Sequence, residues 1–187
     1  ARAAIDNIDA CVFDAYGTLF DVASAASHCQ EELGDKWAPL AQMWRDKQLQ
    51  YTWLRSLMDE YVTFWQITQD SLDYALASFQ IEDDALRQKL LDIYFKLYAY
   101  PEGPGVMKIL KDGGKKVATL SNGSPDMLNS AVNNAGLELD AVSSVDKVGI
   151  YKPDSRIYQM ACDDLDVTKE RVCFMSSNAW DAWAAAN

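Results

Sequence analysis

The sequence predicts an α/β fold in which a parallel sheet carries helices on both faces and a bundle of helices is inserted after the first strand. Two observations predict it. In the second half of the chain, short apolar stretches typical of strands alternate with helical patterns, as in β-α-β units. Between the first predicted strand and this alternation, residues 22–98 carry apolar side chains at helical spacing.

The first predicted strand runs from Ala10 to Phe13 and stops at Asp14. Gly17 follows three residues later and allows a tight turn. In open α/β sheets the ligand site lies beyond the carboxyl ends of the strands, so Asp14 is a candidate for chemistry. Taken alone, an acid at this place is better explained as the cap of a loop. The strands that follow decide between the two interpretations.

Residues 22–98 predict two or three antiparallel helices in a small bundle. We place the N-caps of the last two helices at Thr68 and at Asp83 or Asp84. Most aromatic residues of this stretch are expected in the bundle core. The predicted domains are therefore a core of residues 1–22 and 99–187 and a helical cap of residues 23–98.

After Tyr100 the pattern changes, and Pro101-Glu102-Gly103-Pro104-Gly105 predicts a linker. One helix is expected to begin at Ser124-Pro125 and to end at Gly136, and Asp154 is expected to cap another. The remaining strands are predicted at Val117–Leu120, Ala141–Val145 and Val172–Met175.

Composition limits the classes of function. The chain has 187 residues, enough for one domain or for a core with a smaller insertion, and its 49% hydrophobic and 24% charged residues are typical of a soluble globular protein. The formal net charge is -11, which repels phosphate backbones, so nucleic acid is not an expected partner. No apolar run is long enough to span a membrane, and no membrane association is expected.

The cysteines and the start of the chain favour a cytoplasmic location. There is no CxxC pair, and three of the four cysteines lie in apolar stretches, so we expect reduced thiols. The first residues lack the apolar segment of a signal peptide. The single histidine, His28, has no evident partner for a nucleophilic triad, so any general base is expected to be a carboxylate or a lysine.

Polar side chains follow all four predicted strands. Because the carboxyl ends of parallel strands meet at one edge of a sheet, we expect these side chains to share one crevice. Each alone is explained as a loop, surface or helix-end residue, but their coincidence at four strand ends indicates a site. They are Asp14, Ser121, Asn122, Lys152, Ser176, Asn178 and Asp181.

Four motifs resemble the haloacid dehalogenase superfamily, which implies a Rossmann-like core with an inserted cap. They are Asp14-Ala15-Tyr16-Gly17-Thr18, Ser121-Asn122-Gly123, Lys152-Pro153-Asp154 and the final acidic loop ending at Asp181. Most of that superfamily are phosphatases, so the resemblance alone does not identify the reaction. Where the phosphatases carry an acid catalyst this chain has Tyr16, and where they carry an acidic Mg²⁺ ligand it has Ser177.

Longer matches in the insert resemble the (S)-2-haloacid dehalogenases specifically. They are Trp44-Arg45-Asp46-Lys47-Gln48 and Tyr51-Thr52-Trp53-Leu54-Arg55. The resemblance implies that the enzyme converts short L-2-haloalkanoates to D-2-hydroxyalkanoates with inversion. It further implies that a displacement releases the halide, that water completes the reaction, and that neither a metal nor a cofactor is needed. A halide leaves as a stable anion and needs no proton, which agrees with the two missing acids.

The resemblance also implies a role for each candidate residue. Asp14 would attack the α-carbon and form an ester that water then cleaves. Arg45 and Asn122 match halide-binding positions, although a charge such as Arg45 also suits an exposed helix face. Ser121 and Lys152 would hold the substrate carboxylate.

The other candidates support these groups. Asp181 would either activate the hydrolytic water or position Lys152. Phe64 and Trp180 would form apolar walls, although single aromatics are equally expected in a core, and Tyr16 would contact the substrate. Supporting polar positions match Thr18, Tyr158, Ser176 and Asn178.

Two alternatives stay open, a metal-dependent phosphatase of the same fold and a catalytically inactive, truncated binding module. The resemblance further implies a homodimer. It also implies another strand and helices beyond Asn187, without which the sheet would have an unprotected edge, so we expect the sequence to be part of a longer chain.

Overall fold

The structure is a computed structural model that describes residues 6–22, 27 and 29–187. His28 lies outside the described residues, as do residues 1–5 of the predicted core and 23–26 of the predicted cap.

A four-stranded parallel sheet in the order β3-β2-β1-β4 forms the centre of the fold, so the predicted α/β class is confirmed. The strands are β1 (Ala10–Phe13), β2 (Lys116–Ser121), β3 (Ala141–Ser144) and β4 (Val172–Met175). β1 is an inner strand in which Val12 is opposite Ala118 of β2 and Phe174 of β4. All four of its residues are buried, as expected of a parallel strand covered on both faces, whereas those of β4 are half-buried.

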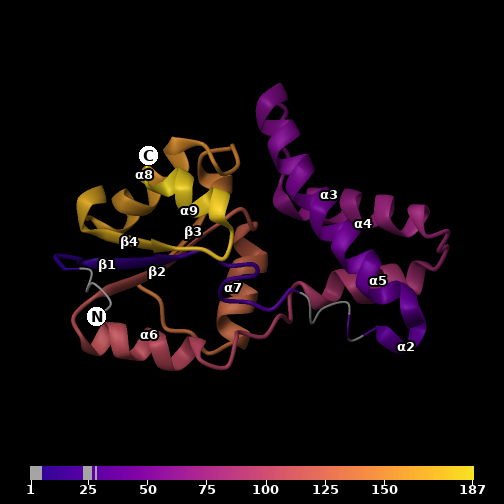
Figure 1. The fold of residues 1–187 in the computed structure, drawn as a ribbon, viewed down its shortest axis with the longest axis horizontal. Helices are drawn as coiled ribbons and strands as arrows, with labels where there is room; N and C mark the ends of the chain where they lie inside the picture. The colour runs from indigo at the N-terminus through magenta and orange to yellow at the C-terminus, as the bar shows by residue number, and fades with distance from the viewer. Residues whose placement is uncertain (1–5, 23–26, 28) are drawn as a thin grey trace.

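Helices cover both faces of the sheet (Figure 1). α8 (Ser155–Leu165) and α9 (Ala179–Ala185) lie on one face, and α6 (Gly103–Asp112) and α7 (Pro125–Asn134) on the other. Asp154 caps α8, as predicted, by accepting a hydrogen bond from the Arg156 N–H. Three short 3-10 helices complete the described core and cap: η1 (Gly34–Lys36), η2 (Val145–Lys147) and η3 (Lys169–Arg171).

Two details of the predicted core were wrong. The stretch predicted as a linker contains the start of α6, because Pro104 occupies the first turn, where its missing N–H leaves no bond unmade, and Met107 then packs into the core. Val145 begins η2 and does not extend β3.

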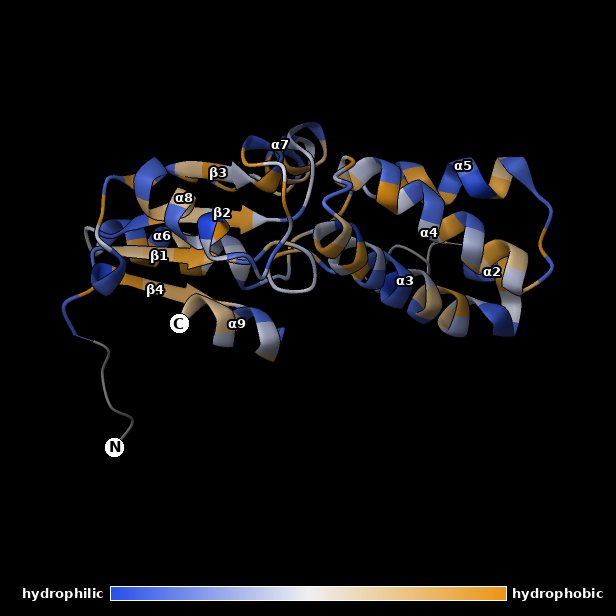
Figure 2. Cartoon of the chain, turned by 90° about the horizontal axis from the view of Figure 1, so that it is seen from above, coloured by the Kyte–Doolittle hydropathy of each residue, from blue (hydrophilic) through white to orange (hydrophobic). Residues whose placement is uncertain are grey.

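The cap consists of α2 (Gln30–Leu33), α3 (Trp37–Met58), α4 (Phe64–Ser78) and α5 (Asp84–Ile93), and the strands of the sheet point towards it (Figure 2). Asp83 caps α5, as predicted. The predicted cap at Thr68 was wrong. α4 begins one turn earlier, with Thr63 as its N-cap, and Thr68 is a buried residue inside the helix whose hydroxyl donates to the Phe64 carbonyl.

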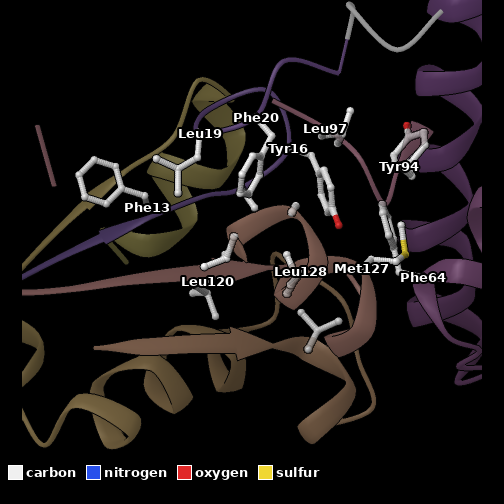
Figure 3. Close-up of a cluster of buried hydrophobic side chains, with 14 of the residues drawn as sticks. Phe13, Tyr16, Leu19, Phe20, Phe64, Tyr94, Leu97, Leu120, Met127 and Leu128 are labelled. Atoms are coloured by element: carbon white, nitrogen blue, oxygen red, sulfur yellow. The ribbon is translucent and has the colours of Figure 1, made fainter. Parts of the chain in front are cut away.

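A cluster of aromatic rings joins the cap to the core (Figure 3). The Tyr16 ring, from the loop after β1, stacks on Phe64 of α4 at 5.7 Å between ring centroids and lies 5.9 Å from Tyr94, just after α5. It also lies 6.3 Å from Phe20 of its own loop. These contacts bury Tyr16 and hold the first turn of α4 against the carboxyl edge of the sheet.

All four cysteines are free thiols. Within the described segments, none of the helices combines the length and the apolar character needed to cross a bilayer.

The buried face of the cap generates a stability prediction. Ile67 of α4 has no exposed surface, so Ile67→Ala should lower the free energy of unfolding by about 2–5 kcal/mol. The matched change Ile109→Ala, on the outer face of α6 where the side chain is 71% exposed, should alter it by less than about 0.5 kcal/mol. Urea denaturation measures both, and equal losses would contradict this assignment of the cap core.

Candidate active site

Asp14 is the first residue beyond β1 and lies at the start of a tight turn. The N–H groups of Thr18, Leu19 and Phe20 all approach the Ala15 carbonyl. Gly17 adopts a φ of +86°, a conformation that other residues rarely take. The turn therefore places Asp14 at the carboxyl edge of the sheet, where its side chain is nearly buried.

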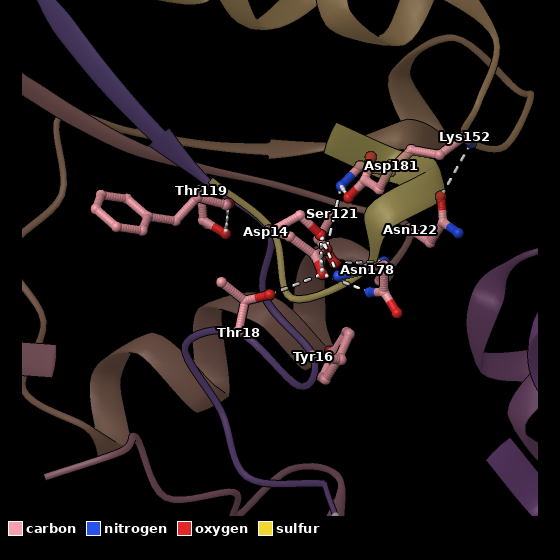
Figure 4. A network of polar contacts seen from close by, with 12 residues as sticks. Asp14, Tyr16, Thr18, Thr119, Ser121, Asn122, Lys152, Asn178 and Asp181 are labelled. Atoms are coloured by element: carbon pink, nitrogen blue, oxygen red, sulfur yellow. Dashed lines mark hydrogen bonds and ion pairs between the residues drawn. The ribbon is translucent and has the colours of Figure 1, made fainter. Parts of the chain in front are cut away.

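Four donors hold the Asp14 carboxylate (Figure 4). Its Oδ2 atom lies 3.2 Å from the Thr18 hydroxyl, 3.3 Å from the Ser176 hydroxyl and 3.2 Å from the Asn178 amide nitrogen. Its Oδ1 atom faces Lys152 Nζ at 3.1 Å. Together the four donors fix the orientation of the carboxylate.

Lys152 connects Asp14 to a second buried carboxylate. Its Nζ atom lies 2.8 Å from Asp181 Oδ2 and 5.1 Å from the centroid of the Phe174 ring. Lys152 is 1% exposed and Asp181 is fully buried, so the two charges of this pair compensate each other away from water. The Lys152 backbone N–H also donates to the Asn122 side-chain oxygen at 3.1 Å.

Tyr158 completes the network. Its hydroxyl donates to Asp181 Oδ1 at 2.7 Å. Burial, and this bond to a carboxylate, raise the pKa of Tyr158, so the phenol stays protonated and remains a donor at neutral pH.

Residues of the cap and the core line one narrow cavity beside Asp14. Its volume is about 10 Å³, roughly the space that one water molecule occupies. The cap contributes charge through Arg45 and apolar surface through Leu49 and Phe64. The core contributes Asp14, Tyr16, Ser121, Asn122, Lys152, Asn178 and Trp180.

Arg45 spans the two parts of the site. Its Nη2 atom donates to the Tyr16 carbonyl of the core at 3.3 Å, and its Nη1 atom donates to Gln48 Oε1 of the cap at 2.8 Å. Trp180 also reaches across, because its ring meets Trp53 of α3 edge-on at 5.4 Å. The cap thus closes the cavity over Asp14.

The structure brings the predicted catalytic residues into one hydrogen-bonded network, which consists of Asp14, Thr18, Lys152, Tyr158, Ser176, Asn178 and Asp181. The predicted substrate contacts all line the same cavity; they are Tyr16, Arg45, Phe64, Ser121, Asn122 and Trp180. At the cavity, the Ser121 hydroxyl accepts a hydrogen bond from the Gly123 N–H at 3.0 Å. Tyr16 differs from the others. Its hydroxyl is buried with no hydrogen-bond partner among the described residues, and burial raises its pKa, so the side chain serves the aromatic cluster and not the polar network.

One residue of the site, Leu49, was not predicted, and two others, Ser177 and Gly123, were named in motifs without a structural role. Leu49 lies one helical turn after Arg45, a spacing that would have indicated it. The Ser177 N–H donates to the Thr18 hydroxyl at 2.9 Å, a contact between two loops that the sequence did not predict. Gly123 lies so close to Tyr16 that a Cβ atom there would be 2.6 Å from the ring.

A metal centre is not evident in the part of the chain that the structure describes, where no three acidic, histidine or cysteine side chains are grouped to hold an ion. Between the carboxylates of Asp14 and Asp181 lies the Lys152 ammonium group.

Comparison with known proteins identifies the family of the chain. A family model described as haloacid dehalogenase-like hydrolase matches residues 8–187. (S)-2-haloacid dehalogenase 1 of Pseudomonas sp. (strain CBS-3) is 48% identical, over 97% of this chain and 81% of that protein. (S)-2-haloacid dehalogenase 4A of Burkholderia cepacia is 46% identical, over 97% of this chain and 80% of that protein.

Solved structures of dehalogenases are also similar to this chain. A dehalogenase crystal structure matches with a TM-score of 0.95 at 46% identity, over 97% of this chain and 82% of that one. L-2-haloacid dehalogenase from Xanthobacter autotrophicus with chloropropionic acid covalently bound matches with a TM-score of 0.89 at 40% identity, over 96% and 74%. The chain belongs to the haloacid dehalogenase-like hydrolase family.

Proposed function

We propose that the chain hydrolyses short L-2-haloalkanoates to D-2-hydroxyalkanoates and halide, with Asp14 as the nucleophile. The chain is a hydrolase that acts on carbon–halide bonds, the activity in the names of its relatives. The observation that carries the assignment is Asp14 itself, hydrogen-bonded to Lys152 at the edge of a cavity that the cap closes.

In the first step, Asp14 Oδ1 attacks the α-carbon and the halide leaves with the electron pair of the carbon–halogen bond. Attack from behind that bond inverts the carbon and forms an ester between Asp14 and the acid. Oδ1 is the better candidate for attack because Oδ2 already accepts from three donors. Arg45 and Asn122 stabilise the departing anion, which needs no proton.

The substrate must be oriented for this attack. Lys152 and Ser121 line the same cavity as Asp14, and we assign them to the substrate carboxylate. Phe64, Trp180 and Tyr16 surround the reacting carbon with apolar surface and exclude water from it.

In the second step, water attacks the ester carbonyl carbon of Asp14. Negative charge then develops on Oδ2, where Thr18, Ser176 and Asn178 already point their donors. Asp181 is the other carboxylate of the network, and we assign it both roles, to orient Lys152 and to take the proton of the water. That proton passes to the alkoxide as the hydroxy acid leaves, and the second proton of the water is released to solvent as Asp14 returns to the carboxylate.

Three further features belong to this proposal. Metal independence is supported by Lys152, whose ammonium already supplies the positive charge between the two carboxylates.

A homodimer is expected from the family resemblance, and the exposed apolar side chains of Leu54, Leu57 and Met58 on α3 support an interface there. A cytoplasmic location stays a prediction, supported by the four free thiols.

The activity itself is tested by halide release. L-2-chloropropionate should yield chloride and D-lactate at the same rate with and without EDTA, because the positive charge at the site comes from Lys152. Ion chromatography and chiral analysis measure the products. Absence of chloride, together with Mg²⁺-dependent cleavage of a phosphate ester, would refute the proposal in favour of a phosphatase.

The nucleophile is tested by Asp14→Asn, which replaces the attacking carboxylate by an uncharged amide. We expect halide release to fall by at least about 10³-fold, as for loss of other covalent nucleophiles. Circular dichroism should stay unchanged because Lys152 keeps its Asp181 partner. The matched control Asp73→Asn alters an acid on the cap that pairs with Arg87 and should keep full activity. A fully active Asp14→Asn enzyme would rule out Asp14 as the nucleophile.

A further inference from the structure

Gln48 is a buried polar side chain to which the proposed reaction assigns no role. It lies on α3 one turn after Arg45 and has no exposed surface. A buried amide is destabilising unless its donors and acceptor are paired, and an apolar residue would fill the same place without that requirement. Its hydrogen bonds therefore indicate its purpose.

The partners of Gln48 determine which way its amide points. The Thr68 hydroxyl has one hydrogen, and the Phe64 carbonyl accepts it at 2.7 Å. Thr68 Oγ1 must therefore act as an acceptor towards Gln48, whose Nε2 atom lies 2.8 Å away. With the nitrogen on this side, the amide oxygen faces the other way.

That oxygen faces Arg45. Gln48 Oε1 accepts from Arg45 Nη1 at 2.8 Å and lies 3.5 Å from the Tyr94 hydroxyl. Burial raises the pKa of Tyr94, which keeps this hydroxyl protonated. A reversed amide would bring its NH₂ group against the N–H donors of Arg45, so the bond that Gln48 donates to Thr68 selects the one orientation that Arg45 can use.

The guanidinium of Arg45 is thus held at two points, by Gln48 in the cap and by the Tyr16 carbonyl in the core. Two bonds to a planar group restrict its rotation as well as its position. Thr68 is itself fixed, because the Trp44 indole N–H donates to its carbonyl at 2.9 Å. A continuous chain of hydrogen bonds therefore runs from α4 to the cavity wall.

We propose that Gln48, oriented by Thr68, is a positioning residue that aims Arg45 at the departing halide. The inference rests on the proposed function, in which Arg45 stabilises that anion. Because Gln48 acts through Arg45, its loss weakens the stabilisation of the leaving group and does not remove a group that contacts the substrate.

The test compares leaving groups. Gln48→Met keeps the length of the side chain and removes the amide, and it should lower kcat/KM for L-2-chloropropionate by about tenfold. The loss with L-2-bromopropionate should be smaller, because bromide leaves more readily and depends less on Arg45. Thr68→Val, which is isosteric, should show the same pattern, and the matched Thr68→Ser, which keeps the hydroxyl, should behave as the wild type.

A double-mutant cycle separates this inference from the role of Arg45. In an Arg45→Met background, Gln48→Met should cause little further loss, because its effect passes through Arg45. If Arg45→Met itself leaves the chloride-to-bromide ratio unchanged, the halide role of Arg45 in the proposed function fails. If Arg45→Met changes that ratio but Gln48→Met and Thr68→Val slow both substrates equally, Gln48 is merely structural and the inference is overturned.

Discussion

The site depends on one buried ammonium group shared by two carboxylates. Lys152 comes from the loop that precedes α8, Asp14 from the end of β1 and Asp181 from the first turn of α9. All three charged groups are buried, so loss of Lys152 would leave two carboxylates without a counter-charge, whereas loss of the Asp14 charge leaves the Lys152–Asp181 pair intact. The order of the sheet makes the arrangement possible, because β1 lies inside it and the segments after β3 and β4, which carry Lys152 and Asp181, reach Asp14 from either side.

The cap completes the site from the opposite side. The aromatic contacts of Tyr16 hold α4 at the carboxyl edge of the sheet, and Arg45 adds a polar connection by donating to the Tyr16 carbonyl. The same loop residue therefore supplies an apolar contact through its ring and a polar one through its backbone.

Much of the fold could be predicted because strand ends carry strong local signals. Asp14, Lys152 and Asp181 were predicted to meet from the geometry of parallel sheets alone, without knowledge of their distances. α6 was missed because a Gly-Pro-Gly sequence also suits a loop, and burial of Met107 decides in favour of the helix. The roles of Thr68 and Gln48 could not be predicted, since the direction of a hydrogen bond depends on how α3 and α4 approach each other.

The central claim is that Asp14 becomes covalently bound to the substrate, and isotope labelling tests it most directly. In a single turnover in ¹⁸O-labelled water with enzyme in excess, the hydroxyl oxygen of the product comes from Asp14, and the label enters the Asp14 carboxylate. Mass spectrometry should then find unlabelled hydroxy acid and a labelled peptide containing Asp14. Labelled product with an unlabelled peptide would show that water attacks the α-carbon itself and would contradict the account.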